Sequence, residues 1–120
     1  MYKISKEFAF SASHILIGLP SGHPCSRLHG HNYVVRVYLK SESLNEVGFV
    51  RDYRALDIVK KYIDDHLDHR HLNDLFSFNP SAENLAKFLY DKFKGDIPEL
   101  YAVEVSETPK TSAVYEVGCK

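Results

Sequence analysis

Apolar and polar residues alternate over residues 2–14, which is the pattern of a β-strand with one buried face. The apolar positions of one parity are Tyr2, Ile4, Phe8 and Phe10. The same alternation returns over residues 31–41 and, near the end of the chain, over residues 100–107 and 112–118. Two glycines and two prolines lie in the segment 17–28, so the pattern predicts a loop that joins the first two strands as a hairpin.

Two further segments have the periodicity of amphipathic helices. The first follows a potential cap at Asp52 and should run to about residue 67. Its apolar residues recur at intervals of three or four, at Leu56, Val59, Ile63 and Leu67. The second helix begins at Asn79-Pro80-Ser81, and its apolar face consists of Leu85, Phe88, Leu89 and Phe93. We expect residues 69–78 to form an irregular crossing between the two helices.

The order of these elements predicts a single α+β domain over residues 1–120, and the composition excludes several functions. Fifteen Lys and Arg residues against sixteen Asp and Glu residues give a net charge of −1, which argues against nucleic-acid binding through bulk charge. The two cysteines, Cys25 and Cys119, form no disulfide framework. The first residues lack an apolar signal segment, and no apolar run approaches the ~20 residues that span a bilayer. We therefore expect a soluble cytoplasmic protein without a nucleic-acid or membrane partner.

Seven histidines are the unusual feature of the composition, and three of them lie at the ends of the first two predicted strands. His14 closes the first strand, and His29 and His31 open the second, where residues two apart point to the same face. Three neutral imidazoles with an open fourth position would form a catalytic zinc site. The alternative is a polar turn without a metal. His23, in the middle of the loop, is a weaker candidate ligand.

Two further groups have more than one interpretation. Cys25, four residues before His29, could be a fourth ligand that closes a structural zinc site. It could instead be a free thiol whose pKa a nearby cation lowers, so that it acts as a base or nucleophile. Asp68 and His69 follow the first predicted helix, where they could be a solvated helix end or an oriented proton-transfer pair.

Taken together, these motifs resemble the 6-pyruvoyl-tetrahydropterin synthase superfamily. The blocks that carry the resemblance are Phe10-Ser11-Ala12-Ser13-His14, Cys25-x-x-x-His29-Gly30-His31, Leu67-Asp68-His69-x-x-Leu72-Asn73-Asp74, Asn79-Pro80-Ser81-x-Glu83-Asn84 and Glu107-Thr108. The three-residue spacer between the cysteine and the His-Gly-His resembles the bacterial and archaeal 6-carboxytetrahydropterin synthase branch, which serves queuosine and deazapurine synthesis. The resemblance implies a T-fold (tunnelling fold), with a four-stranded antiparallel sheet and two helices between strands two and three. It also implies a homohexamer, built as a dimer of trimers, with active sites at subunit interfaces.

The resemblance assigns a role to each candidate residue. The zinc ligands would be His14, His29 and His31. The catalytic thiol would be Cys25, and its proton-transfer partners would be Asp68 and His69. Glu107 would bind the pterin ring, and it shares the parity of Val103 and Val105, so we expect it in the pocket that contains the zinc.

The implied reaction converts 7,8-dihydroneopterin triphosphate to 6-carboxy-5,6,7,8-tetrahydropterin, with loss of acetaldehyde and triphosphate. Two alternatives stay open. One is 6-pyruvoyl-tetrahydropterin synthesis, which uses the same residues and stops before carbon–carbon cleavage. The other is a zinc-stabilised pterin-binding protein without turnover. The combination of Cys25 with Asp68 and His69 favours an enzyme, because binding alone needs no thiol.

Overall fold

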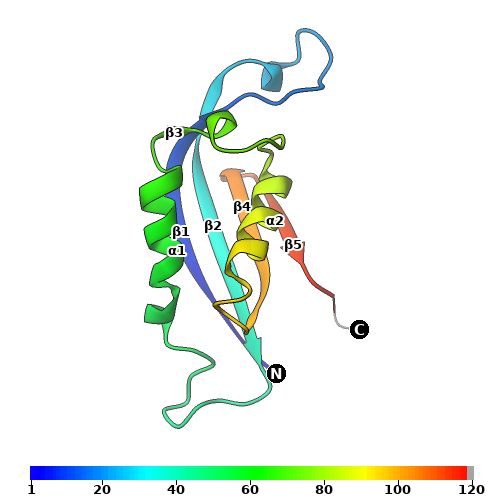
Figure 1. The fold of residues 1–120 in the computed structure, drawn as a ribbon. Helices are drawn as coiled ribbons and strands as arrows, with labels where there is room; N and C mark the ends of the chain where they lie inside the picture. Colours follow the sequence, from blue (N-terminus) through cyan, green and yellow to red (C-terminus); the bar gives the residue numbers. More distant parts are fainter. Residues whose placement is uncertain (119–120) are drawn as a thin grey trace.

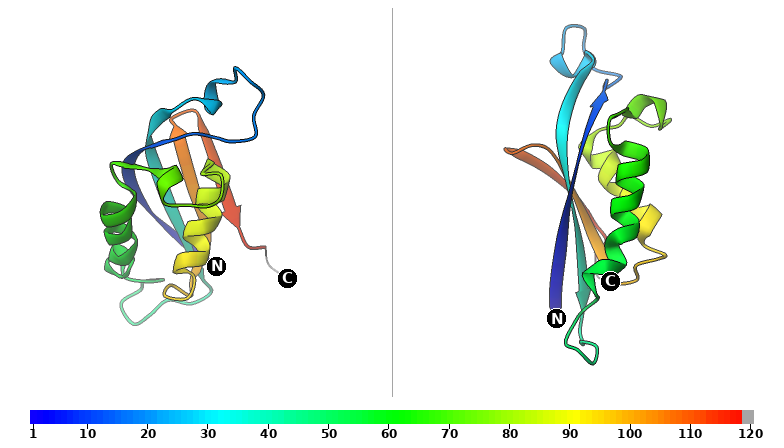
Figure 2. Two further views of the ribbon diagram at one scale, coloured as in Figure 1. Left: turned by 45° about the horizontal axis from the view of Figure 1, so that its top comes forward. Right: turned by 90° about the vertical axis from the view of Figure 1, so that its left-hand side faces the viewer.

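The computed structural model describes residues 1–118, so Cys119 lies outside the described residues. A five-stranded sheet has the order β3-β1-β2-β4-β5. The strands are β1 (Tyr2–His14), β2 (His29–Ser41), β3 (Arg70–His71), β4 (Leu100–Thr108) and β5 (Thr111–Glu116). The two predicted helices lie between β2 and β4 in the chain and cover one face of the sheet, while its other face is bare (Figures 1 and 2).

The first helical segment changes its geometry along its length. A 3-10 turn over Tyr53–Leu56 leads into α1 (Asp57–Tyr62), and a π-helix over Ile63–Leu67 follows it directly. The Asp52 side chain caps the segment by accepting a hydrogen bond from the Arg54 N–H, as the sequence predicts. The second helix, α2 (Ala82–Phe93), begins at Ser81, whose hydroxyl accepts a hydrogen bond from the Asn84 N–H.

The core lies between the sheet and the two helical segments. The predicted stripe of the first segment is confirmed, because Leu56, Val59, Ile63 and Leu67 are all buried. From β2, the buried side chains of the same face are Tyr33, Val35, Val37 and Leu39. Burial of each such side chain contributes roughly 1.5–3 kcal/mol to folding, so alternation along β2 fixes which face the helices cover.

The expectation of a four-stranded antiparallel sheet is wrong, because β3 adds a fifth strand. This strand pairs with β1 in parallel, Ala12 with Arg70 and Ser13 with His71, so the sheet has five strands and is mixed. The other neighbouring pairs are antiparallel. A two-residue strand shows no alternation, which is why the sequence predicts only an irregular crossing there. No helix within residues 1–118 is long and apolar enough to cross a membrane.

Candidate metal centre and active site

Three imidazoles meet where β1 ends and β2 begins. His14 lies directly opposite His29 in the antiparallel register, and His31 lies opposite Ala12. Alternation places all three rings on the helix-covered face, and one ligand nitrogen from each lies within 4.8 Å of the others. The hairpin register therefore brings the predicted His14, His29 and His31 to one point.

The hydrogen bonds of two of these rings favour a metal. His14 is buried, and its Nδ1 lies 2.8 Å from the Pro80 carbonyl oxygen; His29 Nδ1 lies 2.6 Å from the Arg27 carbonyl oxygen. A neutral imidazole that donates from Nδ1 to a carbonyl keeps its lone pair on Nε2. The two Nε2 atoms are 2.8 Å apart, so two lone pairs face each other unless a cation lies between them. A bound metal ion removes this repulsion.

The environment of His31 also favours a neutral ligand. Burial lowers the pKa of His31. The charge of Glu107 raises it in part, and the neighbouring His14 and His29 lower it, so the net shift is downward. The Glu107 Oε2 atom lies 3.1 Å from His31 Nε2, but this nitrogen has no partner in hydrogen-bond geometry among the described residues. A buried polar atom without a hydrogen bond costs about 1–3 kcal/mol, which coordination to a metal would offset.

Glu107 lies beside this cluster near the end of β4. Its side chain is 22% exposed, and it lines a hollow of about 550 Å³ together with His31 and Asn32. One wall of a neighbouring hollow, near Ala82 at the start of α2, is also formed by Glu107. The carboxylate thus lies next to a metal-ligand candidate and remains open to a small molecule.

Tyr33 is a member of the site that sequence reasoning missed. Its hydroxyl lies 3.2 Å from His14 Nδ1, and its ring stacks on Phe10 with centroids 4.8 Å apart. Burial, and secondarily the charge of Glu107, raises the pKa of Tyr33, so the hydroxyl stays neutral. The signal was its parity, because Tyr33 follows His29 and His31 at intervals of two along the same strand.

Cys25 lies in a 3-10 turn over Pro24–Ser26 of the loop between β1 and β2. Its thiol is free and half-buried, and it is not part of the three-histidine cluster. The His23 ring is also separate, because its Nδ1 accepts a hydrogen bond from the Cys25 N–H at 3.1 Å. The arrangement favours the free-thiol interpretation of Cys25 over a closing ligand.

Asp68 and His69 form an ordered pair directly after the π-helix. The Asp68 N–H donates to the Ile63 carbonyl at 2.9 Å, which is the wider turn of a π-helix, a geometry frequent at functional sites. One Asp68 oxygen accepts from the Ser11 N–H at 2.9 Å, and the other lies 2.9 Å from His69 Nδ1. First the Ser11 N–H and then His69 lower the pKa of Asp68.

The backbone of His69 is strained. With a φ of 59°, it is the one non-glycine residue in the left-handed region within residues 1–118. Its N–H donates to the Ser11 carbonyl at 2.6 Å, and its side chain is 82% exposed. A left-handed residue costs roughly 1–2 kcal/mol, and such strain gathers at functional sites.

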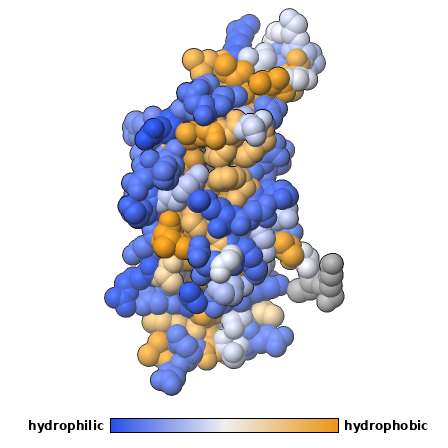
Figure 3. Space-filling model, in the orientation of Figure 1, coloured by the Kyte–Doolittle hydropathy of each residue, from blue (hydrophilic) through white to orange (hydrophobic). Residues whose placement is uncertain are grey.

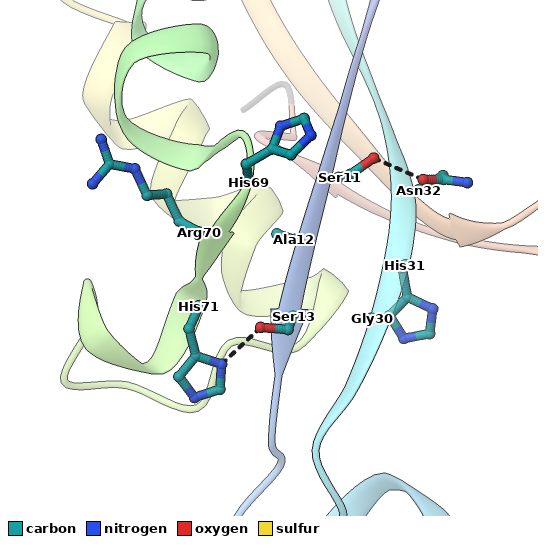
Figure 4. Close-up of a pocket in the computed structure, with 9 residues that line it drawn as sticks. All are labelled: Ser11, Ala12, Ser13, Gly30, His31, Asn32, His69, Arg70 and His71. Carbon is teal, nitrogen blue, oxygen red and sulfur yellow. Dashed lines mark hydrogen bonds between the residues drawn. The ribbon is translucent and has the colours of Figure 1, made fainter.

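His69 and the three-histidine cluster face different sides of the sheet. His69 lines a hollow of about 510 Å³ with Ser13 and Asn32, which alternation places on the bare face (Figure 4). Hydrogen bonds join Ser13 to His71 and Ser11 to Asn32 across this hollow. The wall also includes His31, yet the metal-binding nitrogens converge on the helix-covered face.

The lowered pKa of Asp68 predicts a pH-dependent stability difference. Asp68→Asn keeps the oxygen that accepts from Ser11 but removes the charge, so the variant should melt at a lower temperature than wild type at pH 7. This advantage of the wild type should begin to shrink as the pH falls to about 4, where the carboxylate of the unfolded chain becomes protonated, and should disappear only at lower pH, where Asp68 of the folded protein is protonated too. Thermal melts between pH 2 and pH 7, at roughly unit intervals, measure it. Asp96→Asn, at an exposed position after α2, is the control, and a difference that persists at the lowest pH would contradict the prediction.

Known proteins similar to this chain point to one family. The family profile described as 6-pyruvoyl tetrahydropterin synthase matches residues 3–117. Proteins named 6-carboxy-5,6,7,8-tetrahydropterin synthase are 37% identical in Synechocystis sp., covering 96% of this chain and 93% of that relative, and 32% identical in Bacillus subtilis, covering 95% and 84%. The structure of Caenorhabditis elegans 6-pyruvoyl tetrahydropterin synthase matches with a TM-score of 0.85 and 29% identity, over 98% of this chain and 96% of the other. This chain belongs to the 6-pyruvoyl tetrahydropterin synthase family.

Proposed function

We propose that this chain is a zinc-dependent lyase that converts 7,8-dihydroneopterin triphosphate and one water to 6-carboxy-5,6,7,8-tetrahydropterin, acetaldehyde and triphosphate, as a step of deazapurine and queuosine synthesis. The observation that carries the proposal is the convergence of His14, His29 and His31, whose ligand nitrogens lie within 4.8 Å of one another beside Glu107. The product named for the Synechocystis and Bacillus relatives supports the choice of reaction within the family.

His14, His29 and His31 would hold the zinc, which fits the donor set because zinc prefers neutral imidazole ligands and keeps an open position in catalytic sites. When bound, the ion supplies Lewis acidity toward the oxygens of the substrate side chain. The free Cys25 side chain would act as the base that takes a proton from the substrate side chain. His69, oriented by Asp68 through the 2.9 Å contact of its Nδ1, returns a proton.

Glu107 would recognise the pterin ring rather than move protons. The 2-amino group and N3 of a pterin are adjacent donors in one plane, and they match the two oxygens of a carboxylate. The hollow beside Glu107 leaves room for a ring next to His31. Binding there would place the substrate side chain near the three imidazoles.

Glu107→Gln tests this role. One acceptor oxygen becomes a donor amide that opposes a pterin N–H, so pterin binding should weaken by ~1–3 kcal/mol while zinc content stays unchanged. Calorimetric titration with a pterin, together with metal analysis, measures both quantities. The matched control is Glu104→Gln, three positions earlier on β4, where the carboxylate binds Tyr38 instead. Equal pterin affinity in Glu107→Gln and wild type would show that the ring binds elsewhere.

We also propose that the active site is completed in a homohexamer, with Asp68 and His69 facing the cluster of a neighbouring copy. Within one chain, His69 lines the hollow on the bare face, whereas the imidazole cluster lies on the helix-covered face. In addition, β3 pairs with β1 only at Ala12 and Ser13, and β5 ends the strand order, so each edge of the sheet offers backbone groups to another copy. Sedimentation of the purified chain at a hexameric mass supports this assembly, and a monomeric mass contradicts it.

One assay tests the reaction itself. The purified, zinc-loaded chain is incubated with 7,8-dihydroneopterin triphosphate, and acetaldehyde and the pterin product are measured. Equal amounts of acetaldehyde and 6-carboxy-5,6,7,8-tetrahydropterin support the proposal. Triphosphate release with a 6-pyruvoyl product and no acetaldehyde would assign the alternative synthase activity. Binding without any product would leave a pterin-binding protein.

A further inference from the structure

The segment of residues 15–17 joins His14 to the loop that carries Cys25, and its burial decreases along the chain from the half-buried first two residues to the exposed Ile17. Ile17 is 73% exposed and Leu28, at the other end of the loop, is 66% exposed. The loop forms one end of the molecule, where apolar side chains show at the surface (the upper end in Figures 1 and 3). Since apolar packing is only partial here, hydrogen bonds contribute to holding this loop against the sheet.

Two asparagine side chains provide these hydrogen bonds. Asn73 Oδ1 accepts from the Ile15 N–H at 2.8 Å, and Asn73 Nδ2 donates to the Ile15 carbonyl at 2.9 Å. Asn79 repeats both contacts with Ile17, each at 2.9 Å. Each carboxamide therefore satisfies both backbone groups of one residue, as a neighbouring strand would. We call Asn73 and Asn79 the asparagine clamp.

The clamp continues the sheet after its edge strand has ended. The pairing of β1 with β3 joins residues 58 positions apart, such as Ala12 and Arg70, and the same separation joins Ile15 to Asn73. Beyond His71 the backbone turns into a 3-10 helix and can no longer pair. The Asn73 side chain provides the donor and the acceptor for Ile15 that the backbone of a longer β3 would have provided.

The clamp reaches Cys25 through one further hydrogen bond. Residue 16 lies between the two clamped residues, and its N–H points to the opposite edge, where it donates to the Cys25 carbonyl at 3.0 Å. On the other side of the clamp, Pro80 follows Asn79 and accepts the hydrogen bond of His14 Nδ1. Asn79 and Pro80 thus contact both the metal-ligand candidate and Ile17, at the start of the loop that carries the thiol.

We propose that Asn73 and Asn79 are positioning residues that set where the Cys25 loop lies relative to the three-histidine cluster. Neither belongs to the three-histidine cluster, and both act through residues 15–17. The inference depends on the proposed function only in taking Cys25 as the reactive thiol.

The test replaces both asparagines by aspartate in a Cys119→Ala background, in which Cys25 is the sole cysteine. A carboxylate can still accept from the Ile15 and Ile17 N–H groups, but it cannot donate to their carbonyls and places oxygen against oxygen. Alkylation of Cys25 by iodoacetamide in the zinc-loaded protein should become about fivefold faster or more. Amide exchange at residues 15–17 should accelerate likewise, while that of the buried β2 residues should not.

Two further variants separate positioning from general destabilisation. Asn45→Asp is the matched control, because Asn45 Oδ1 accepts from the N–H groups of Val47 and Phe49 in the loop at the opposite end of the sheet. It should leave Cys25 alkylation unchanged. Ile17→Pro removes the N–H that donates to Asn79 Oδ1. The Ile17 side chain is exposed, so its loss costs little packing. This variant should accelerate alkylation of Cys25, and it tests the proposal even if the double variant fails to fold.

Two results would overturn the proposal. One is wild-type alkylation and exchange in Ile17→Pro and in the folded double variant. The other is acceleration of exchange in β2 and β4 equal to that at residues 15–17, which would give the asparagines a role in the whole fold instead. Neither measurement uses a pterin. If the variants expose Cys25 as expected but the wild-type protein shows no turnover, the positioning role of the clamp is supported and only the proposed function is contradicted.

Discussion

His14→Ala should leave the protein with less than about a tenth of the zinc that wild type binds, and turnover should fall by at least ~1,000-fold. The wild-type ring is fully buried, and the Pro80 carbonyl fixes the direction of its Nε2 lone pair. Two remaining imidazoles cannot enclose the ion, and a metal supplies several kcal/mol of transition-state stabilisation, about tenfold in rate for each 1.4 kcal/mol. Metal analysis after dialysis and the acetaldehyde assay measure the two effects.

Two companion variants make this result specific. His66→Ala removes an exposed histidine whose ring lies against Tyr62, and it should keep its zinc and activity. His29→Ala removes a proposed ligand at a half-buried position, so it tests metal binding without the core cavity that His14→Ala creates. Full zinc binding by both His14→Ala and His29→Ala would refute the three-histidine site.

Cys25→Ala should lower turnover by at least ~100-fold, the lower end of the contribution of a general base. Its zinc content should equal that of wild type, because the thiol lies outside the three-histidine cluster. The change removes a half-buried side chain in an exposed loop, so the melting temperature should hardly change. Steady-state kinetics, metal analysis and a thermal melt on one preparation give all three quantities.

The opposite pattern would reassign the cysteine. If zinc is lost together with activity in Cys25→Ala, the thiol is a ligand, and a cobalt-substituted wild type should then show strong thiolate absorption. The sequence provides a second thiol for comparison, since Cys119→Ala should change neither zinc content nor turnover.

Features with a regular period could be predicted from the sequence. Alternation in β1 and β2 predicts the hairpin, and the hairpin alone is sufficient to bring His14 opposite His29. The stripe from Leu56 to Leu67 predicts the first helical segment and its buried face. In both cases several residues on one face share the same burial, so their individually weak preferences for apolar side chains add up to a recognisable pattern.

Features that depend on single contacts could not be predicted in this way. β3 consists of two residues held by backbone pairing to Ala12 and Ser13, and such pairing leaves no trace in side-chain type. The π-helix before Asp68 ends in a backbone hydrogen bond from Asp68 to Ile63, which side-chain periodicity does not reveal. The asparagine clamp uses side chains in place of a strand, so its residues lie in a segment that the sequence presents only as irregular.

The left-handed backbone of His69 has a consequence for how this position can change. Glycine and asparagine adopt such a conformation at lower cost, and an exposed pair such as His69 with Asp68 contributes little to stability. Selection for heat resistance alone should therefore replace His69, whereas selection for turnover should keep it. Laboratory populations evolved under the two regimes should diverge at position 69, and the thermostable lineages should lose activity there first.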